Sequence, residues 1–194
     1  MADPSLYSYP DPLHGWEGLE PLSNERNVDG KSLKNPTPIK LSSAYTQFPA
    51  PIPTGSQRAA FDVHIYYLQT SPSESKFAQH LHERIRREFP ELRVYTLWDK
   101  PIGPHPVAMF EINLFTPAQF GAFIPWLVIN RGPLSALVHP NTGDDERDHT
   151  QRATWMGQPY PLQTGMLRKA KESQVVSSGR ASGPCPNGLG VNLV

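Results

Sequence analysis

Histidines are the side chains of this chain best suited to chemistry near neutral pH, and two of them can be combined with a glutamate. His64 and Glu111 each lie inside a run rich in β-branched and aromatic residues, and His139 ends a third apolar run. Two imidazoles and one carboxylate form the ligand set of many non-haem Fe(II) centres, which leaves positions open for substrate and oxygen. The sequence therefore predicts a metal site of His64, His139 and Glu111, provided that the fold brings the three runs together.

Two further histidines are candidates for acid and base chemistry, because imidazole gains and loses protons near neutral pH. His105 lies between two prolines, which restrict its backbone, and His149 closes an acidic loop that could begin a helical turn. Each is a candidate general acid/base or substitute metal ligand, and an exposed loop histidine is an equally good interpretation of His149. The predicted topology places His105 at the end of the sheet away from His139, so that it would join the site only across a cavity or from a second subunit.

The elements that must hold these residues follow from hydrophobic periods and capping signals. Alternating apolar residues predict strands, and apolar residues at helical spacing after a Ser or Thr cap and a proline predict helices. Strand, helix, strand, strand, helix, strand is the order of a ferredoxin-like α+β domain, βαββαβ, with a four-stranded antiparallel sheet and both helices on one face. The predicted strands are 61–69, 92–98, 107–115 and 134–139, and the predicted helices are 71–89 and 116–130.

Side-chain alternation places the three proposed ligands on the sheet face that the helices leave open. If Val63 and the alternate residues after it face the helices, His64 must point the other way, and the same argument applies to Glu111 and His139. The first and third strands are central neighbours and the fourth lies beside the first, so the three side chains meet at one end of the sheet. A register shift of one residue would break this arrangement. The alternative is a structural His64 at a dimer interface and a solvated Glu111.

Composition bounds the rest of the molecule. The 194 residues include 18 basic and 18 acidic side chains, giving a net charge of +0 without a dense basic run, which argues against nucleic acid and anionic membranes as partners. A single cysteine, no leader pattern and no long apolar run predict a soluble, cytoplasmic protein. Prolines crowd the first part of the chain. We therefore predict an extended arm at 1–57, a domain at 58–165 and a disordered tail at 166–194.

The open sheet face predicts either a cover or a ligand, because it would otherwise expose apolar and aromatic side chains. A second subunit, the arm or a ligand pocket would each serve, and we expect a homodimer. A non-catalytic dimeric module that binds a small molecule on this face is the alternative to an enzyme. A metal enzyme of another reaction type is a third hypothesis, since fold does not fix function. The sequence has no phosphate-binding glycine loop and no nucleophile elbow.

Several motifs resemble the DOPA 4,5-dioxygenase family of small extradiol-type enzymes. The similar segments are FDVHIYY, IGPHPVAMFEINLF and, most distinctively, HPNTGDD followed by DHT and WMG, within about residues 58–162. The resemblance implies a ferredoxin-like fold and oxygen-dependent cleavage of a catechol such as L-DOPA by non-haem Fe(II), giving a seco-acid that cyclises to betalamic acid or muscaflavin. It also implies that histidines are the metal and catalytic groups, at positions that here are His64, His105, His139 and His149.

The remaining candidates would contact the substrate. Tyr66 on the open face and Trp155 after the acidic loop could stack on an aromatic ring. Arg131 or Arg147 could meet a substrate carboxylate. His105 and His149 are the expected acid/base residues, whereas the choice of Glu111 as the carboxylate ligand rests on topology alone.

Overall fold

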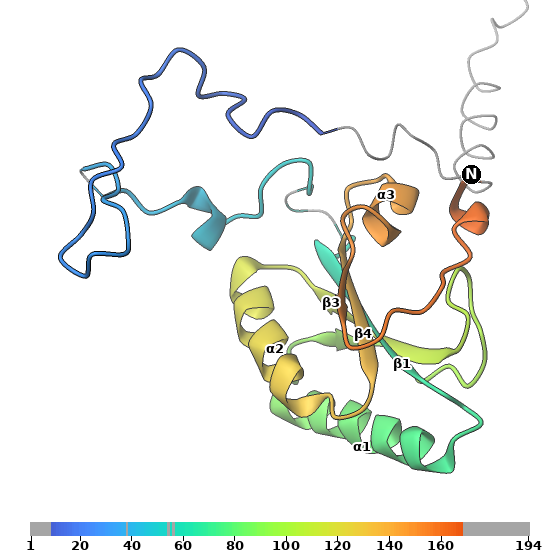
Figure 1. Cartoon of the computed structure of the whole chain (residues 1–194). Coiled ribbons are helices and arrows are strands. Elements are labelled where there is room, and N and C mark those ends of the chain that lie inside the picture. The colour runs from blue at the N-terminus through green and yellow to red at the C-terminus, as the bar shows by residue number, and fades with distance from the viewer. Residues whose placement is uncertain (1–8, 38, 54, 56, 169–194) are drawn as a thin grey trace, which may run out of the picture.

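The fold is an antiparallel sheet with its two long helices on one face, as seen in a computed structural model that describes residues 9–37, 39–53, 55 and 57–168 (Figure 1). The sheet has five strands in the order β2-β3-β1-β4-β5, and all neighbouring strands are antiparallel. The strands are β1 (Phe61–Tyr67), β2 (Arg93–Val94), β3 (Ala108–Leu114), β4 (Ser135–Pro140) and β5 (Thr154–Met156), and the helices are α1 (Pro72–Glu88), α2 (Pro117–Asn130) and α3 (Asp145–His149).

The two long helices begin where their capping signals predict. The Ser71 side chain accepts a hydrogen bond from the Glu74 amide at the start of α1, and Thr116 accepts one from the Gln119 amide at the start of α2. Each helix has proline in its first turn, where the missing N–H costs nothing. Both helices pack on the same face of the sheet (Figure 1).

The main core lies between the helices and this sheet face. Val63, Ile65 and Tyr67 of β1 belong to it, as do the alternate residues of β3 and β4. The predicted side-chain alternation is therefore confirmed on all three central strands. In the register of β1 and β3, His64 pairs directly with Glu111, and β4 places His139 opposite Asp62.

The prediction of four strands is wrong, because β5 adds a fifth beside β4. The three residues of β5 pair with Ala136–Val138. The second predicted strand is also shorter than expected. Val94 pairs with Ile112, and the next bridge joins Trp98 to Met109. The chain therefore advances four residues on the β2 side of the ladder and three residues on the β3 side. One extra residue therefore bulges out of this edge of the ladder, which ends regular pairing early.

The open face is covered by the chain itself. A second apolar cluster of Tyr66, Met109 and Leu137 lies there, and residues from the 98–107 connection and the 153–162 segment pack against it. The structure thus adds a cover that differs from the second subunit, the arm or the ligand considered above. The homodimer stays a prediction.

The segments on either side of the domain are simple in outline. The arm from residue 9 runs in largely exposed, irregular form away from the domain (Figure 1), with one short 3-10 turn at Ser43–Tyr45. Phe48 anchors its end by packing on Phe61 and Phe120. At the other end, residues 165–168 are helical, and the rest of the predicted disordered tail lies outside the described residues. Among the residues described, no helix has the length and apolarity needed to cross a membrane.

Candidate metal centre

His64 and His139 form the buried centre of the site on the open sheet face. Their Nε2 atoms lie 3.0 Å apart, and the two residues are 4% and 1% exposed. Imidazole nitrogens bind zinc-sized divalent ions at about 2.0–2.1 Å, so two of them at right angles around one ion would lie roughly 3 Å apart. The observed spacing fits two neighbouring ligands of a single ion, and it equally fits the hydrogen bond that joins the two Nε2 atoms when no ion lies between them. The predicted convergence of these two histidines is confirmed.

His105 and His149 complete a cluster of four imidazoles. The ring centroid of His105 lies 4.3 Å from that of His64, and the ring centroid of His149 lies 3.9 Å from that of His139. The expectation that His105 lies at the far end of the sheet is wrong. The connection before β3 turns back through a bridge between Ile102 and His105, which brings this ring over the open face within the same chain. His149 arrives on α3, the helical turn predicted from its acidic loop.

In three of these rings Nδ1, which we call the outer nitrogen, already has a polar partner; Nε2 is the inner nitrogen. Nδ1 of His139 lies 2.9 Å from the carbonyl oxygen of Pro140, and Nδ1 of His149 lies 2.8 Å from that of Asp145. Both must therefore carry hydrogen on Nδ1, which leaves the lone pair on Nε2. Nδ1 of His105 lies 2.7 Å from the Tyr66 hydroxyl. Such contacts fix the tautomer of metal-binding histidines.

Two overlapping groups of three residues could hold a metal ion among the residues described. One comprises His64, His105 and His149, and the other Asp62, His64 and His139; within each group the ligand atoms lie within 4.8 Å of one another. His64 is common to both groups. Sequence reasoning did not select Asp62, although it lies two residues before His64 and therefore on the same strand face, a signal that could have identified it.

Glu111 lies next to the cluster but belongs to neither group. Its Oε2 atom faces Nδ1 of His64 at 3.8 Å. The Asn113 side chain joins the two carboxylates, since its Nδ2 donates to Oδ1 of Asp62 and to Oε1 of Glu111, each at 2.7 Å. Asn113 is a further residue that sequence reasoning missed, and its parity with Glu111 on β3 was the available signal.

Burial sets the charge state of the cluster. It lowers the pKa of His105 to about 3 and that of His149 to about 4, with neighbouring imidazoles adding to both effects. The pKa of His64 lies well below its usual value, and that of His139 is also lowered, again mainly through burial. Burial, followed by the charge of Asp62, raises the pKa of Glu111 to about 7. Near pH 7 the rings are therefore neutral and carry lone pairs.

The metal-free protein should lose stability on acidification. The unfolded chain protonates its histidines below about pH 6.5, whereas the folded cluster resists protonation, so the histidine contribution falls as pH drops from 6.5 towards 4. Glu111 opposes this change, because its raised pKa favours the folded state below pH 4.5 and loses that benefit as pH rises through 7. Four histidines should outweigh it. Urea unfolding in EDTA between pH 7.5 and 4.5 measures the slope, and His105→Gln should flatten it; stability that rises on acidification would contradict this account.

Two acidic residues of the 144–149 loop hold the scaffold of the site. Asp148 is 1% exposed; its carboxylate accepts hydrogen bonds from the Thr142 amide at 2.7 Å, from the Thr142 hydroxyl, and from Arg152. Glu146 is buried and pairs with Arg168. From the sequence we would interpret acids in such a loop as solvated, but partners within the fold replace water around both carboxylates.

The proposed substrate-contact residues separate into two places. Tyr66 is fully buried beside the cluster and stacks on Trp155 with a centroid distance of 5.3 Å. Arg131 lies where α2 ends and β4 begins, and its Nη1 donates to the carbonyl of Leu134 at 2.6 Å. Since β4 rises about 3.3 Å per residue, the start of that strand lies roughly 13 Å from His139. The structure brings Tyr66 and Trp155 to the cluster but leaves Arg131 at the opposite end of β4.

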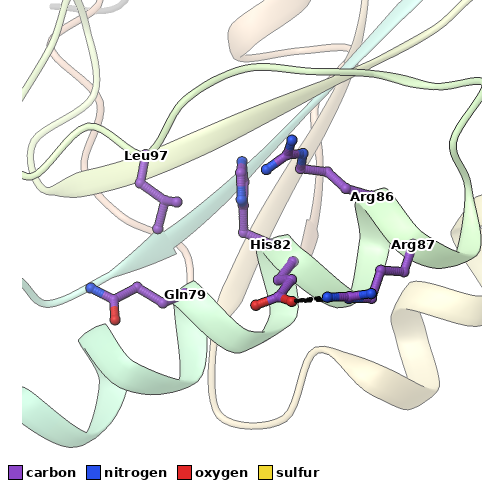
Figure 2. Close-up of a pocket in the computed structure, with 6 residues that line it drawn as sticks. Gln79, His82, Arg86, Arg87 and Leu97 are labelled. Carbon is purple, nitrogen blue, oxygen red and sulfur yellow. Dashed lines mark hydrogen bonds and ion pairs between the residues drawn. The ribbon is translucent and has the colours of Figure 1, made fainter.

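A hollow of about 420 Å³ lies on the helix side of the sheet, where residues of α1 and Leu97 line it (Figure 2). Glu83 and Arg87 form an ion pair at its rim, and His82 donates to the Tyr95 carbonyl at 2.8 Å. These contacts satisfy the polar side chains locally. Among the residues described, the groups able to hold a metal ion lie in the histidine cluster and not at this hollow.

Comparison with known proteins identifies the family of this chain. The model of the Dopa 4,5-dioxygenase family matches residues 61–166, more than half of the chain and all of the cluster. The chain belongs to this family. The matched span begins at the first residue of β1 and ends within the helical turn at residues 165–168, so it includes the sheet, its cover and the acidic loop. The resemblance inferred from the motifs is confirmed.

Named relatives and a solved structure agree with this membership. An uncharacterized 21.2 kDa protein of Botryotinia fuckeliana is 61% identical over 181 residues, covering 90% of this chain and 98% of that protein. The DOPA 4,5-dioxygenase of Amanita muscaria is 36% identical over 110 residues, covering 54% of this chain and 47% of that protein. The crystal structure of a putative dioxygenase from Nostoc punctiforme is 36% identical with a TM-score of 0.53, covering 58% of this chain and 94% of that chain.

Proposed function

We propose that this member of the Dopa 4,5-dioxygenase family is an extradiol ring-cleaving dioxygenase that uses non-haem Fe(II) and O₂ on a catechol such as L-DOPA. Cleavage at the 4,5 position would give a seco-DOPA precursor of betalamic acid or muscaflavin-type pigments. The observation that carries the proposal is the cluster of four buried imidazoles, two of them with Nε2 atoms 3.0 Å apart, beside a carboxylate. Family membership supplies the reaction class.

The donor set fits a divalent iron. His64 and His139 would provide two neutral imidazoles, and Asp62 lies close enough to both to provide the carboxylate of a two-histidine, one-carboxylate centre. Geometry favours Asp62 over Glu111 in that role, because Glu111 faces the outer nitrogen of His64. The Asn141 side chain lies beside the same carboxylate, and its hydrogen bond to Asp62 partly offsets the burial that raises the pKa of this group.

The protein residues would bind, orient and exchange protons with the catechol. When bound, Fe(II) supplies Lewis acidity towards two adjacent phenolic oxygens and brings O₂ beside an electron-rich ring. His105 and His149 are neutral near pH 7, so either can accept the second phenolic proton and later return one during O–O cleavage. Tyr66 would orient His105 through its hydroxyl, and the Tyr66 and Trp155 rings would bound the aromatic substrate.

Tyr66→Phe should separate proton transfer from metal binding. The substitution keeps the ring that stacks on Trp155 and removes the hydroxyl 2.7 Å from His105. We expect turnover to fall about 10- to 100-fold, less than the roughly 10²- to 10⁴-fold effect of losing an acid–base residue because His105 itself remains, while one equivalent of iron is retained. Steady-state oxygen uptake together with an iron assay measures both. Unchanged turnover would remove the Tyr66–His105 pair from the mechanism.

Anaerobic reconstitution tests the proposed function. Full-length protein is loaded with Fe(II), separated from free metal, and mixed with oxygenated buffer containing L-DOPA, 4-methylcatechol or tyrosine. We expect one iron per chain, oxygen consumption with both catechols but not with tyrosine, and a yellow ring-cleaved product from L-DOPA. A better kcat/KM for L-DOPA than for 4-methylcatechol would support recognition of the amino-acid part of the substrate. Oxygen consumption without ring cleavage, or ligand binding without iron, would reject the proposal.

A further inference from the structure

His64 differs from the other three histidines in the surroundings of its outer nitrogen. Nδ1 of His64 is buried and makes no hydrogen bond to any residue that the structure describes. The same atom in His105, His139 and His149 has a hydroxyl or carbonyl oxygen within 2.9 Å. With no ion between them, Nε2 of His64 donates to Nε2 of His139, whose own hydrogen lies on Nδ1. An ion bound at these Nε2 atoms moves the His64 hydrogen to Nδ1, where a buried N–H without an acceptor would cost about 1–3 kcal/mol.

Glu111 is placed to be that partner. β1 and β3 pair His64 directly with Glu111, so the two side chains leave neighbouring backbones on the same sheet face. Oε2 of Glu111 lies 3.8 Å from Nδ1 of His64, about 0.9 Å beyond a normal N–H···O distance. The bond therefore requires the two atoms to approach each other by about 0.9 Å.

The rest of the Glu111 carboxylate is already held in place. Asn113, which is 3% exposed, donates from Nδ2 to Oε1 of Glu111 and to Oδ1 of Asp62, each at 2.7 Å. The two hydrogens of this amide are then both used, one on each carboxylate. Oε2 of Glu111 is left to face His64, whereas Asp62 lies in the group with His64 and His139. The Asn113 amide thereby holds Glu111 beside Nδ1 of His64 and holds Asp62 beside the nitrogens that could bind a metal ion.

We propose that Glu111 is a positioning residue that accepts the Nδ1 hydrogen of His64 when a metal ion is bound, and not a metal ligand. This inference rests on the proposed metal centre and refines it. A hydrogen on Nδ1 leaves the lone pair of His64 on Nε2, where it faces His139. All four imidazoles then follow one rule, with an oxygen on the outer nitrogen and the inner nitrogen free for chemistry.

Metal affinity and the spectrum of the bound ion separate this role from the alternatives. Full-length wild type, Glu111→Gln, Asp62→Asn and the surface control Glu83→Gln are titrated anaerobically with Fe(II) and with Co(II) against a competing chelator. We expect Glu111→Gln to keep one site per chain and the wild-type shape of the Co(II) absorption bands, but to bind about 10- to 100-fold more weakly. Glu83→Gln should match wild type, because Glu83 is exposed and paired with Arg87.

The imidazole proton itself provides a readout besides metal affinity. In Zn(II)-loaded protein with ¹⁵N-labelled histidine, the Nδ1 hydrogen of His64 should give a slowly exchanging, downfield resonance that moves upfield in Glu111→Gln and is lost in Glu111→Ala. A Glu111→Asp variant should restore part of the metal affinity lost in Glu111→Ala, because it keeps the carboxylate. A purely structural role would move neither the resonance nor the affinity.

The possible failures are distinguishable. Changed Co(II) bands in Glu111→Gln with normal bands in Asp62→Asn would show that Glu111 is the ligand and overturn the inference. Unchanged affinity and an unchanged His64 resonance in Glu111→Gln would also overturn it, while leaving the proposed dioxygenase intact. Absence of metal binding in wild type would reject the metal centre itself, and the inference with it.

Discussion

His64→Ala is expected to abolish metal binding and ring cleavage together. His64 is common to both groups of residues that could hold a metal ion, and its Nε2 lies 3.0 Å from that of His139. Its removal should weaken metal binding by more than the 10- to 100-fold typical of a residue outside the ligand shell. Chelator competition gives the affinity, and oxygen uptake with L-DOPA gives the activity.

His80→Ala is the matched control, because His80 is an exposed histidine of α1 on the other side of the sheet. It should bind one metal ion and turn over like wild type. Far-ultraviolet circular dichroism checks that both variants fold. If folded His64→Ala kept one equivalent of tightly bound metal and most of its activity, the proposed centre would be wrong even if the reaction were right.

Asp148→Ala should cause the largest loss of stability outside the hydrophobic core. Its buried carboxylate accepts hydrogen bonds from the Thr142 amide and hydroxyl and from Arg152, which links both ends of the loop that carries His149. Truncation leaves these donors unsatisfied and a cation without its partner, so we expect the free energy of unfolding to fall by about 3 kcal/mol. Urea denaturation of the metal-free protein measures this loss.

The same substitution should also weaken metal binding, since α3 would no longer hold His149 over the cluster. Asp99→Ala, at an exposed position before β3, should change the free energy of unfolding by less than about 0.5 kcal/mol. A loss in Asp148→Ala as small as that of the control would mean that the loop is held by other contacts.

Local rules were sufficient to predict the elements and the face on which each side chain lies. Alternation in β1 and β3 is strict, and a strand has only two faces, so His64, Tyr66 and Glu111 had to share one. Strand order then made His139 their neighbour. These inferences needed only the alternation of side chains along each strand and the order of the strands in the sheet. They required no distances, which is why they could be made from the sequence.

The errors arose where a connection, and not a strand, carries the residue. His105 reaches the cluster because its connection folds back, and no periodic signal records the path of such a segment. The fifth strand is only three residues long, too short to show a period. The roles of Asp148 and Asn113 depend on burial and on specific partners, which their residue types alone do not indicate.

The choice between Asp62 and Glu111 shows the limit most clearly. Both carboxylates lie on the sheet face that carries His64, Asp62 on the same strand and Glu111 on the neighbouring one. Either would complete the pattern of two histidines and one carboxylate. Only the distances separate them, since Glu111 faces the outer nitrogen of His64 and Asp62 lies in the group with His64 and His139. A difference of a few ångströms between neighbouring side chains lies beyond what residue type and spacing can specify.

Isotope labelling tests the central claim most directly. Iron-loaded protein is allowed to turn over L-DOPA under ¹⁸O₂, with borohydride added at once so that the new aldehyde is reduced before it exchanges with water or cyclises. Extradiol cleavage places one oxygen atom in the carboxylate and the other in the aldehyde, so the trapped product should be 4 Da heavier than the product formed under ¹⁶O₂. Incorporation of a single label or none, with the ring left closed, would contradict dioxygenase chemistry at this centre.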